Sequence, residues 1–151
     1  MKMTGPILLM LTLWLSGCAE YVPFSSGALI GNSVPVPAHW TDITLPKIIQ
    51  LETKPEKPYS VKLWIVKLGA ALYVHAGTNR AAWVANIETN PRVKLLVGET
   101  LYKLSAERVT TQAEFNAFSE VYETKYGRRP GNEIVDEAYL FRLTGKHAGQ
   151  L

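Results

Sequence analysis

Residues 59–75, with the sequence YSVKLWIVKLGAALYVH, encode a β-hairpin. Val61, Leu63 and Ile65 alternate with polar or amphipathic residues, which is the period of two expected of a strand with one buried face. A short connection containing Gly69 then leads into a second apolar run, residues 71–75. Because so tight a connection joins neighbouring antiparallel strands, this stretch places the chain in the mainly β class.

Further strand patterns flank this hairpin on both sides. Residues 48–53 form an apolar run that ends in the breaker segment Lys54-Pro55-Glu56-Lys57-Pro58. Residues 93–97 and 101–109 alternate again around a turn at Gly98-Glu99, and residues 138–144 form a last strand. The sequence therefore predicts about six strands.

Two helices interrupt the strand pattern. The first is expected from about Asn79 to Thr89, stopped by Asn90-Pro91, with an apolar side made of Trp83, Val84 and Ile87. The second is expected to start after Thr110 and to end at Gly127. Thr111 and Glu114 have the spacing of a capping box at its start. Six strands with two helices predict an α+β, mainly β fold, a six-stranded split or closed β-barrel.

The N-terminus has the pattern of an export signal. Lys2 is followed by an apolar stretch from Ile7 to Leu15 that is too short to span a bilayer, which takes about 20 residues. Leu15-Ser16-Gly17-Cys18 resembles the cleavage motif of bacterial lipoproteins, in which the cysteine is acylated. That resemblance implies a signal peptide over residues 1–17, lipidation of Cys18 and a place in the bacterial cell envelope. The anchor would lie on the exported side, in the outer membrane or on the periplasmic face of the inner membrane.

Residues 18–38 are rich in Pro, Ser, Gly and Val without a regular period, and they predict a flexible tether. The globular domain is expected over residues 39–151, which is enough chain for one core. The whole chain carries 16 basic and 13 acidic residues. Because the basic residues are scattered, nucleic acid is excluded as the expected partner.

The segment that joins the 71–75 strand to the first helix is the main candidate for chemistry. It runs from His75 through Gly77 to Thr78-Asn79-Arg80. Backbone N–H groups at a helix start, together with an arginine, favour a phosphate or another anion. The alternative interpretation is that Thr78 or Asn79 caps the helix while Arg80 is solvated.

Four motifs occur in the order seen in FMN-binding split-barrel proteins: residues 58–64, residues 72–74, Trp83-Val84-Ala85-Asn86-Ile87 and Asn90-Pro91-Arg92-Val93. Over roughly residues 51–143 the chain resembles the superfamily of pyridoxamine-phosphate oxidases and deazaflavin-dependent nitroreductases. The resemblance implies a homodimer that holds FMN or a deazaflavin relative at the subunit interface. It assigns the cofactor phosphate to Ser60, Lys62, Thr78, Asn79 and Arg80, and it makes Trp64 and His75 neighbours of the ring.

One departure from the family pattern bears on this assignment. Oxidase members carry a Ser-Arg-Lys-type cluster, whereas Arg80 is followed here by Ala81-Ala82, which predicts reduced phosphate affinity. His75 has no acidic partner near it in sequence, so a packed or solvated histidine is favoured over a general acid. No metal-ligand cluster and no hydrolase motif is found in the sequence.

Two functions follow from the sequence. The first is a membrane-anchored lipoprotein that binds FMN or a related flavin and acts as a small-molecule oxidoreductase. The second is a lipoprotein that keeps the barrel for binding or scaffolding without a cofactor. The basic segment after the second helix, Lys125-Tyr126-Gly127-Arg128-Arg129, is a candidate anion contact, although cations also complement a helix C-terminus.

Overall fold

The computed structural model describes residues 27–145. Its strands are β1 (Asn32–Val34), β2 (Ile48–Thr53), β3 (Tyr59–Leu68), β4 (Ala71–His75), β5 (Arg92–Val97), β6 (Thr100–Arg108) and β7 (Leu140–Gly145). The helices are α1 (Ala82–Thr89), between β4 and β5, and α2 (Gln112–Tyr126), between β6 and β7. All six predicted strands and both predicted helices are present.

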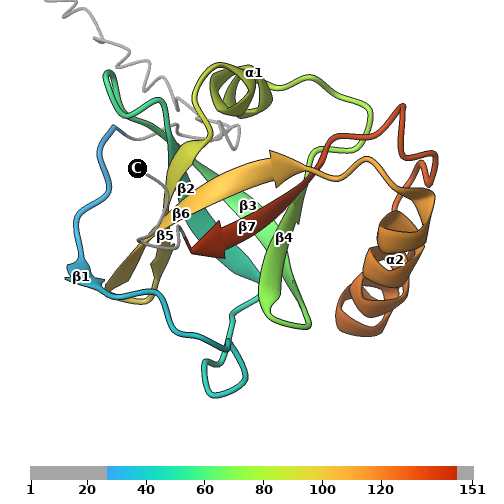
Figure 1. The fold of residues 1–151 in the computed structure, drawn as a ribbon, viewed down its shortest axis with the longest axis horizontal. Helices are drawn as coiled ribbons and strands as arrows, with labels where there is room; N and C mark the ends of the chain where they lie inside the picture. The colour runs from blue at the N-terminus through green and yellow to red at the C-terminus, as the bar shows by residue number, and fades with distance from the viewer. Residues whose placement is uncertain (1–26, 146–151) are drawn as a thin grey trace, which may run out of the picture.

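The sheet closes on itself and forms a barrel (Figure 1). Its strand order is β1-β6-β5-β2-β3-β4-β7, and an additional β6–β7 pairing joins the two sides. The six barrel strands pair antiparallel, whereas the short β1 pairs in parallel with the start of β6, from Thr100 to Tyr102. The predicted six-stranded barrel with two helices is therefore confirmed, with one additional outer strand.

The barrel interior is the main hydrophobic core. Alternate residues of the strands point inward and are fully buried, including Leu51, Ile65, Leu72 and Leu95. Helix α1 lies over one end of the barrel (Figure 1) and contributes Trp83, Val84 and Ile87 to this core. Trp40, 1% exposed, packs edge-on against Tyr102 with ring centroids 5.0 Å apart.

A second core lies outside the barrel. Helix α2 packs beside β3 and β4 (Figure 1) and buries Phe115, Phe118 and Tyr122 against the outward residues Val66 and Tyr73. Strand β3 therefore contributes side chains to both cores. Its inward residues fill the barrel, and its last outward residues lie under α2.

The start of α2 corrects one prediction. Thr111 is the N-cap residue, but its side chain makes no capping hydrogen bond. Glu114 instead accepts hydrogen bonds from the Tyr73 hydroxyl at 2.8 Å and from Arg142 at 3.0 Å. The predicted capping box is wrong because these tertiary partners compete for the carboxylate. The predicted end of the helix at Gly127 is confirmed, with Gly127 at φ 74°.

Residues 27–38, which the sequence placed in the tether, lie on the barrel. Leu29 is 8% exposed, and its backbone N–H donates to Oε2 of Glu52 at 2.6 Å. Because β6 offers a free edge beside Thr100, β1 can pair with it. Cys18 and the rest of the predicted signal lie outside the described residues.

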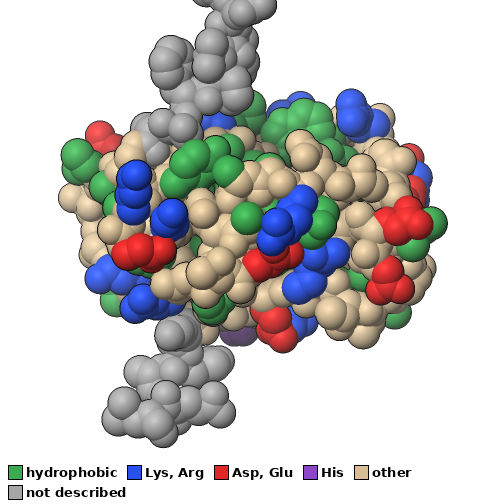
Figure 2. Space-filling model, turned by 90° about the horizontal axis from the view of Figure 1, so that it is seen from above, with side chains coloured by type: hydrophobic (Ala, Val, Ile, Leu, Met, Phe, Trp, Pro, Cys, Tyr) green, Lys and Arg blue, Asp and Glu red, His purple; other side chains and the backbone are tan. Residues whose placement is uncertain are grey.

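Charges of both signs are interspersed over the face shown in Figure 2, without an extended patch of one sign. Within residues 27–145, no helix is long and apolar enough to cross a membrane.

Candidate functional site

The outer face of β3 carries two of the predicted site residues in exposed positions. Strand alternation directs Ser60, Lys62 and Trp64 to the same side of the sheet. Lys62 and Trp64 are exposed, whereas Ser60 is only 1% exposed. The register pairs Trp64 with Ile48 on β2, which is also exposed. This face therefore combines a cation with uncovered apolar surface.

Trp64 forms a braced aromatic surface. Its indole is 40% exposed and stacks on the ring of Tyr126, with centroids 4.4 Å apart and planes 9° from parallel. The guanidinium of Arg128 lies 5.6 Å from the Trp64 ring. We call Lys62, Trp64, Tyr126 and Arg128 the Trp64 platform.

The platform is held in place by hydrogen bonds between α2 and β3. The Tyr126 hydroxyl accepts from the backbone N–H of Ile65 at 2.9 Å, and its single proton is shared between the carbonyls of Ile65 and Lys47, each 2.8 Å away. Lys125 donates to the carbonyl of Ile65 at 2.9 Å. Burial raises the pKa of Tyr126 and lowers the pKa of Lys125. The tyrosine is therefore a neutral hydrogen-bonded support for Trp64 at physiological pH.

The Gly77–Arg80 turn differs from the predicted helix start. Helix α1 begins at Ala82 with Ala81 as its N-cap, and no side chain caps it. Within the turn, the N–H of Asn79 donates to the carbonyl of Ala76 at 3.3 Å, and the N–H of Ala81 donates to the carbonyl of Asn79 at 2.8 Å. These two donors are thus used by the chain itself, and the expected cap at Thr78 or Asn79 is absent.

Arg80 is also engaged by the protein. Its Nη2 and Nε donate to Oε2 of Glu88 at 2.6 Å and 2.9 Å. Both side chains are on the surface, 58% and 35% exposed, so the pair can open at small cost. Thr78 and Asn79 are exposed beside it. The three residues form a surface group at the α1 end of the barrel and are not part of the Trp64 platform.

His75 lies beneath α2, in the second core. Its ring contacts Phe115, Phe118 and Tyr122 with centroids 5.8 Å, 5.6 Å and 6.3 Å apart. The buried Nε2 atom has no hydrogen-bond partner, and burial lowers the pKa of His75 to about 4. Tyr122 also contacts Trp64, at 5.9 Å, so the two predicted ring neighbours flank one tyrosine. Trp64 is exposed there, whereas His75 is half-buried.

Two platform residues come from a segment to which the sequence gave no firm role. Tyr126 and Arg128 sit on either side of the Gly127 cap, where a basic residue is ordinarily explained by the helix dipole. Their place beside Trp64 depends on how α2 docks, and no local pattern signals it. In the described part of the chain, no three metal-ligand side chains come together.

Comparisons with known proteins identify the fold. No family model and no curated protein matches the chain. Among solved structures, a putative pyridoxamine 5'-phosphate oxidase from Listeria innocua aligns with TM-score 0.53 and 13% identity, covering 68% of this chain and 86% of its own. A putative 5-nitroimidazole antibiotic resistance protein from Bacteroides thetaiotaomicron aligns with TM-score 0.54 and 11% identity, covering 67% and 74%.

A third similar structure is HutZ, the heme storage protein from Vibrio cholerae, with TM-score 0.51 and 21% identity over 68% of this chain and 83% of that one. The protein therefore has the split-barrel fold shared by the oxidase-like proteins and HutZ, as the sequence resemblance predicted. At these identities the likeness shows the fold and leaves the ligand to be argued from the residues of this chain.

Proposed function

We propose that the protein binds a planar, negatively charged cofactor of the flavin type, FMN or a deazaflavin relative, and serves as a small-molecule oxidoreductase of the bacterial cell envelope. The observation that carries the proposal is the Trp64 platform, an exposed indole that stacks on Tyr126 and has the Arg128 guanidinium 5.6 Å from its ring. The split-barrel fold supports it, because the solved structures of this fold include a putative pyridoxamine 5'-phosphate oxidase.

The residues of the platform suit such a cofactor chemically. Trp64 offers an aromatic surface on which a planar ring can stack, and stacking of this kind is worth about 1–3 kcal/mol. Lys62 and Arg128 supply positive charge for a phosphate, Arg128 with a planar fork of donors. A bound flavin supplies the electron-transfer chemistry, while the protein positions the ring and neutralises its charge.

We further propose that the protein is lipid-anchored and forms a homodimer. Lipidation of Cys18 would hold the barrel at a membrane, since several acyl chains anchor a protein durably. A homodimer would cover the exposed Ile48 and Trp64 and turn the open platform into an enclosed site.

A second candidate function is a binding or scaffolding lipoprotein without a cofactor. One observation favours it. Arg80, the arginine of the predicted phosphate site, is already paired with Glu88, and two amides of its turn are bonded to carbonyls of the same turn. A phosphate would have to displace Glu88 in order to use this arginine.

Titration of the purified full-length chain with FMN, in a non-ionic detergent, separates the two functions. We expect FMN to bind and to quench tryptophan fluorescence, because Trp64 is exposed whereas Trp40 and Trp83, the other tryptophans within residues 27–145, are 1% and 3% exposed. Trp64→Leu should weaken FMN binding by about tenfold, the loss of one stacking contact. Lys57→Gln, which removes an exposed lysine from the turn before β3, is the matched control and should leave binding unchanged.

Two outcomes would contradict the proposal. Absence of binding at millimolar FMN would leave the cofactor-free function. Binding that is insensitive to Trp64→Leu but lost in Arg80→Gln would move the site to the α1 end of the barrel.

A further inference from the structure

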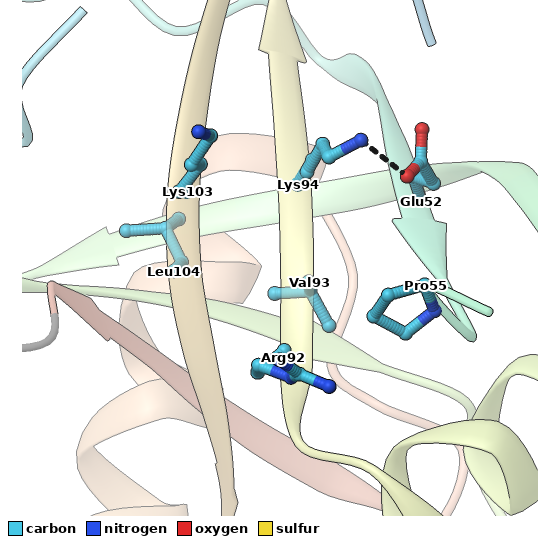
Figure 3. A pocket seen from close by; sticks show the side chains of 7 residues that line it. All are labelled: Glu52, Pro55, Arg92, Val93, Lys94, Lys103 and Leu104. Atoms are coloured by element: carbon cyan, nitrogen blue, oxygen red, sulfur yellow. Dashed lines mark ion pairs between the residues drawn. The ribbon is translucent and has the colours of Figure 1, made fainter. Parts of the chain in front are cut away.

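A pocket of about 300 Å³ opens over β2, β5 and β6 (Figure 3). We call it the Glu52 pocket; its lining residues are Glu52, Pro55, Arg92, Val93, Lys94, Lys103 and Leu104. It contains none of the residues assigned above to a cofactor. Three of its side chains are cationic and one is a carboxylate, so it carries two positive charges in excess.

Strand register brings these charges together. Glu52 on β2 pairs with Lys94 on β5, and Lys94 pairs directly with Lys103 on β6. Like charges directly opposite on neighbouring strands destabilise a sheet. Figure 3 shows Lys94 turned toward Glu52, with Lys103 beside it on the adjacent strand. The pairing of Lys94 with Lys103 is therefore an unfavourable arrangement that a bound anion would relieve.

Among the residues that the structure describes, one of the three cations is paired with a carboxylate. Lys94 Nζ lies 2.8 Å from Oε1 of Glu52, while Oε2 accepts the N–H of Leu29 at 2.6 Å. Glu52 is 2% exposed and both of its oxygens are engaged. Within residues 27–145, no ion pair joins a carboxylate to Arg92 or Lys103, and the Arg92 guanidinium donates one hydrogen bond, from Nε to the side-chain oxygen of Asn90 at 3.2 Å.

From these charges we infer that the Glu52 pocket is a binding site for a small organic phosphate monoester. A phosphomonoester carries a charge of about −2 near neutral pH, which matches the two uncompensated cations. The fork of Arg92 fits phosphate oxygens, and the apolar ring of Pro55 in the lining favours an ester with an organic group over inorganic phosphate.

This site is separate from the Trp64 platform. Ser60, which is opposite Glu52, precedes Trp64 by four residues on β3, about 13 Å along the strand, and precedes Lys62, the platform residue on β3 nearest to Glu52, by two residues, about 7 Å. Lys94 lies two strands away from β3, about 10 Å across the sheet. Binding at the Glu52 pocket therefore does not depend on flavin binding at the Trp64 indole.

Isothermal titration of the full-length chain with phenyl phosphate tests the site, with inorganic phosphate and benzoate as comparison ligands. We expect phenyl phosphate to bind more tightly than either. Replacing both exposed cations, Arg92→Gln with Lys103→Gln, should weaken it by about tenfold or more, because two charge-assisted contacts are lost. Two controls should keep wild-type affinity: Lys57→Gln, which removes a charge outside the pocket, and Trp64→Leu, which alters the platform.

The inference is overturned if phenyl phosphate fails to bind at millimolar concentration, or if the double variant binds it as the wild type does. Benzoate binding as tightly as phenyl phosphate would overturn the phosphate class. Equal loss in Lys57→Gln would show a general charge effect instead of a site. Because Arg92 and Lys103 are exposed, the double variant should fold, and its circular dichroism spectrum checks this.

Discussion

Acidification from pH 7 to pH 5 should destabilise the fold through His75. The imidazole is packed among Phe115, Phe118 and Tyr122, and burial lowers its pKa from 6.5 to about 4. Between these two values the unfolded chain binds a proton that the folded protein excludes. The stability that neutral His75 permits is present above pH 6.5 and is lost progressively as the pH falls toward 4.

The size of the effect follows from the two pKa values. One pKa unit corresponds to about 1.4 kcal/mol, and the difference of 2.5 units from 6.5 to about 4 is nearly fully expressed only at pH 4. Between pH 7 and pH 5 the free energy of unfolding should fall by about 2 kcal/mol because of this residue.

Urea unfolding of wild type and His75→Gln at several pH values measures this contribution. Glutamine does not titrate, so the variant should lose about 2 kcal/mol less than the wild type between pH 7 and pH 5, whatever its stability at pH 7. His39→Gln, which removes an exposed histidine, should follow the wild type. Parallel pH profiles for wild type and His75→Gln would refute the reasoning. They would show that His75 takes up its proton in the folded protein over the same pH range as in the unfolded chain.

Three further substitutions test the packing that the structure shows. Gly31→Ala should lower the free energy of unfolding by about 1–3 kcal/mol, since a Cβ there would lie 2.7 Å from the Leu96 side chain and 2.8 Å from the Glu99 carbonyl; urea unfolding measures it. Thr111→Ala should change the free energy of unfolding by less than about 0.5 kcal/mol, because the Thr111 side chain makes no capping hydrogen bond. A loss near 1 kcal/mol would show that the capping box forms. Tyr126→Phe should destabilise by about 1–3 kcal/mol and increase acrylamide quenching of Trp64 fluorescence, because the hydroxyl bonds that hold the platform are lost; unchanged quenching would contradict that role.

The candidate site was predictable in part. Lys62 and Trp64 could be placed on one outer face of β3 from alternation alone, and the structure exposes both. His75 has the same alternation on β4, but α2 covers it, so its burial could not be read from the strand. The Glu52 pocket escaped prediction because Glu52, Lys94 and Lys103 meet only through strand register.

The contacts of residues 27–38 could not be predicted from local sequence either. The Pro-rich, aperiodic composition of this segment predicted a tether, and composition carries no information about an available partner edge. In the structure β1 pairs with the start of β6, and Leu29 donates to the buried carboxylate of Glu52. Both contacts join residues far apart in the chain.

Strand positions, helix positions and the barrel class followed from local patterns, because period-two alternation, turn residues and the Gly127 cap express the preferences of neighbouring residues. The contents of the sites followed from tertiary structure. Tyr126 reaches Ile65 across 61 positions of sequence and thereby braces Trp64, while the pairing of β2 with β5 sets Glu52 against Lys94. Such contacts depend on how α2 docks and how the strands align, since burial and charge pairing arise between distant segments that local sequence does not relate.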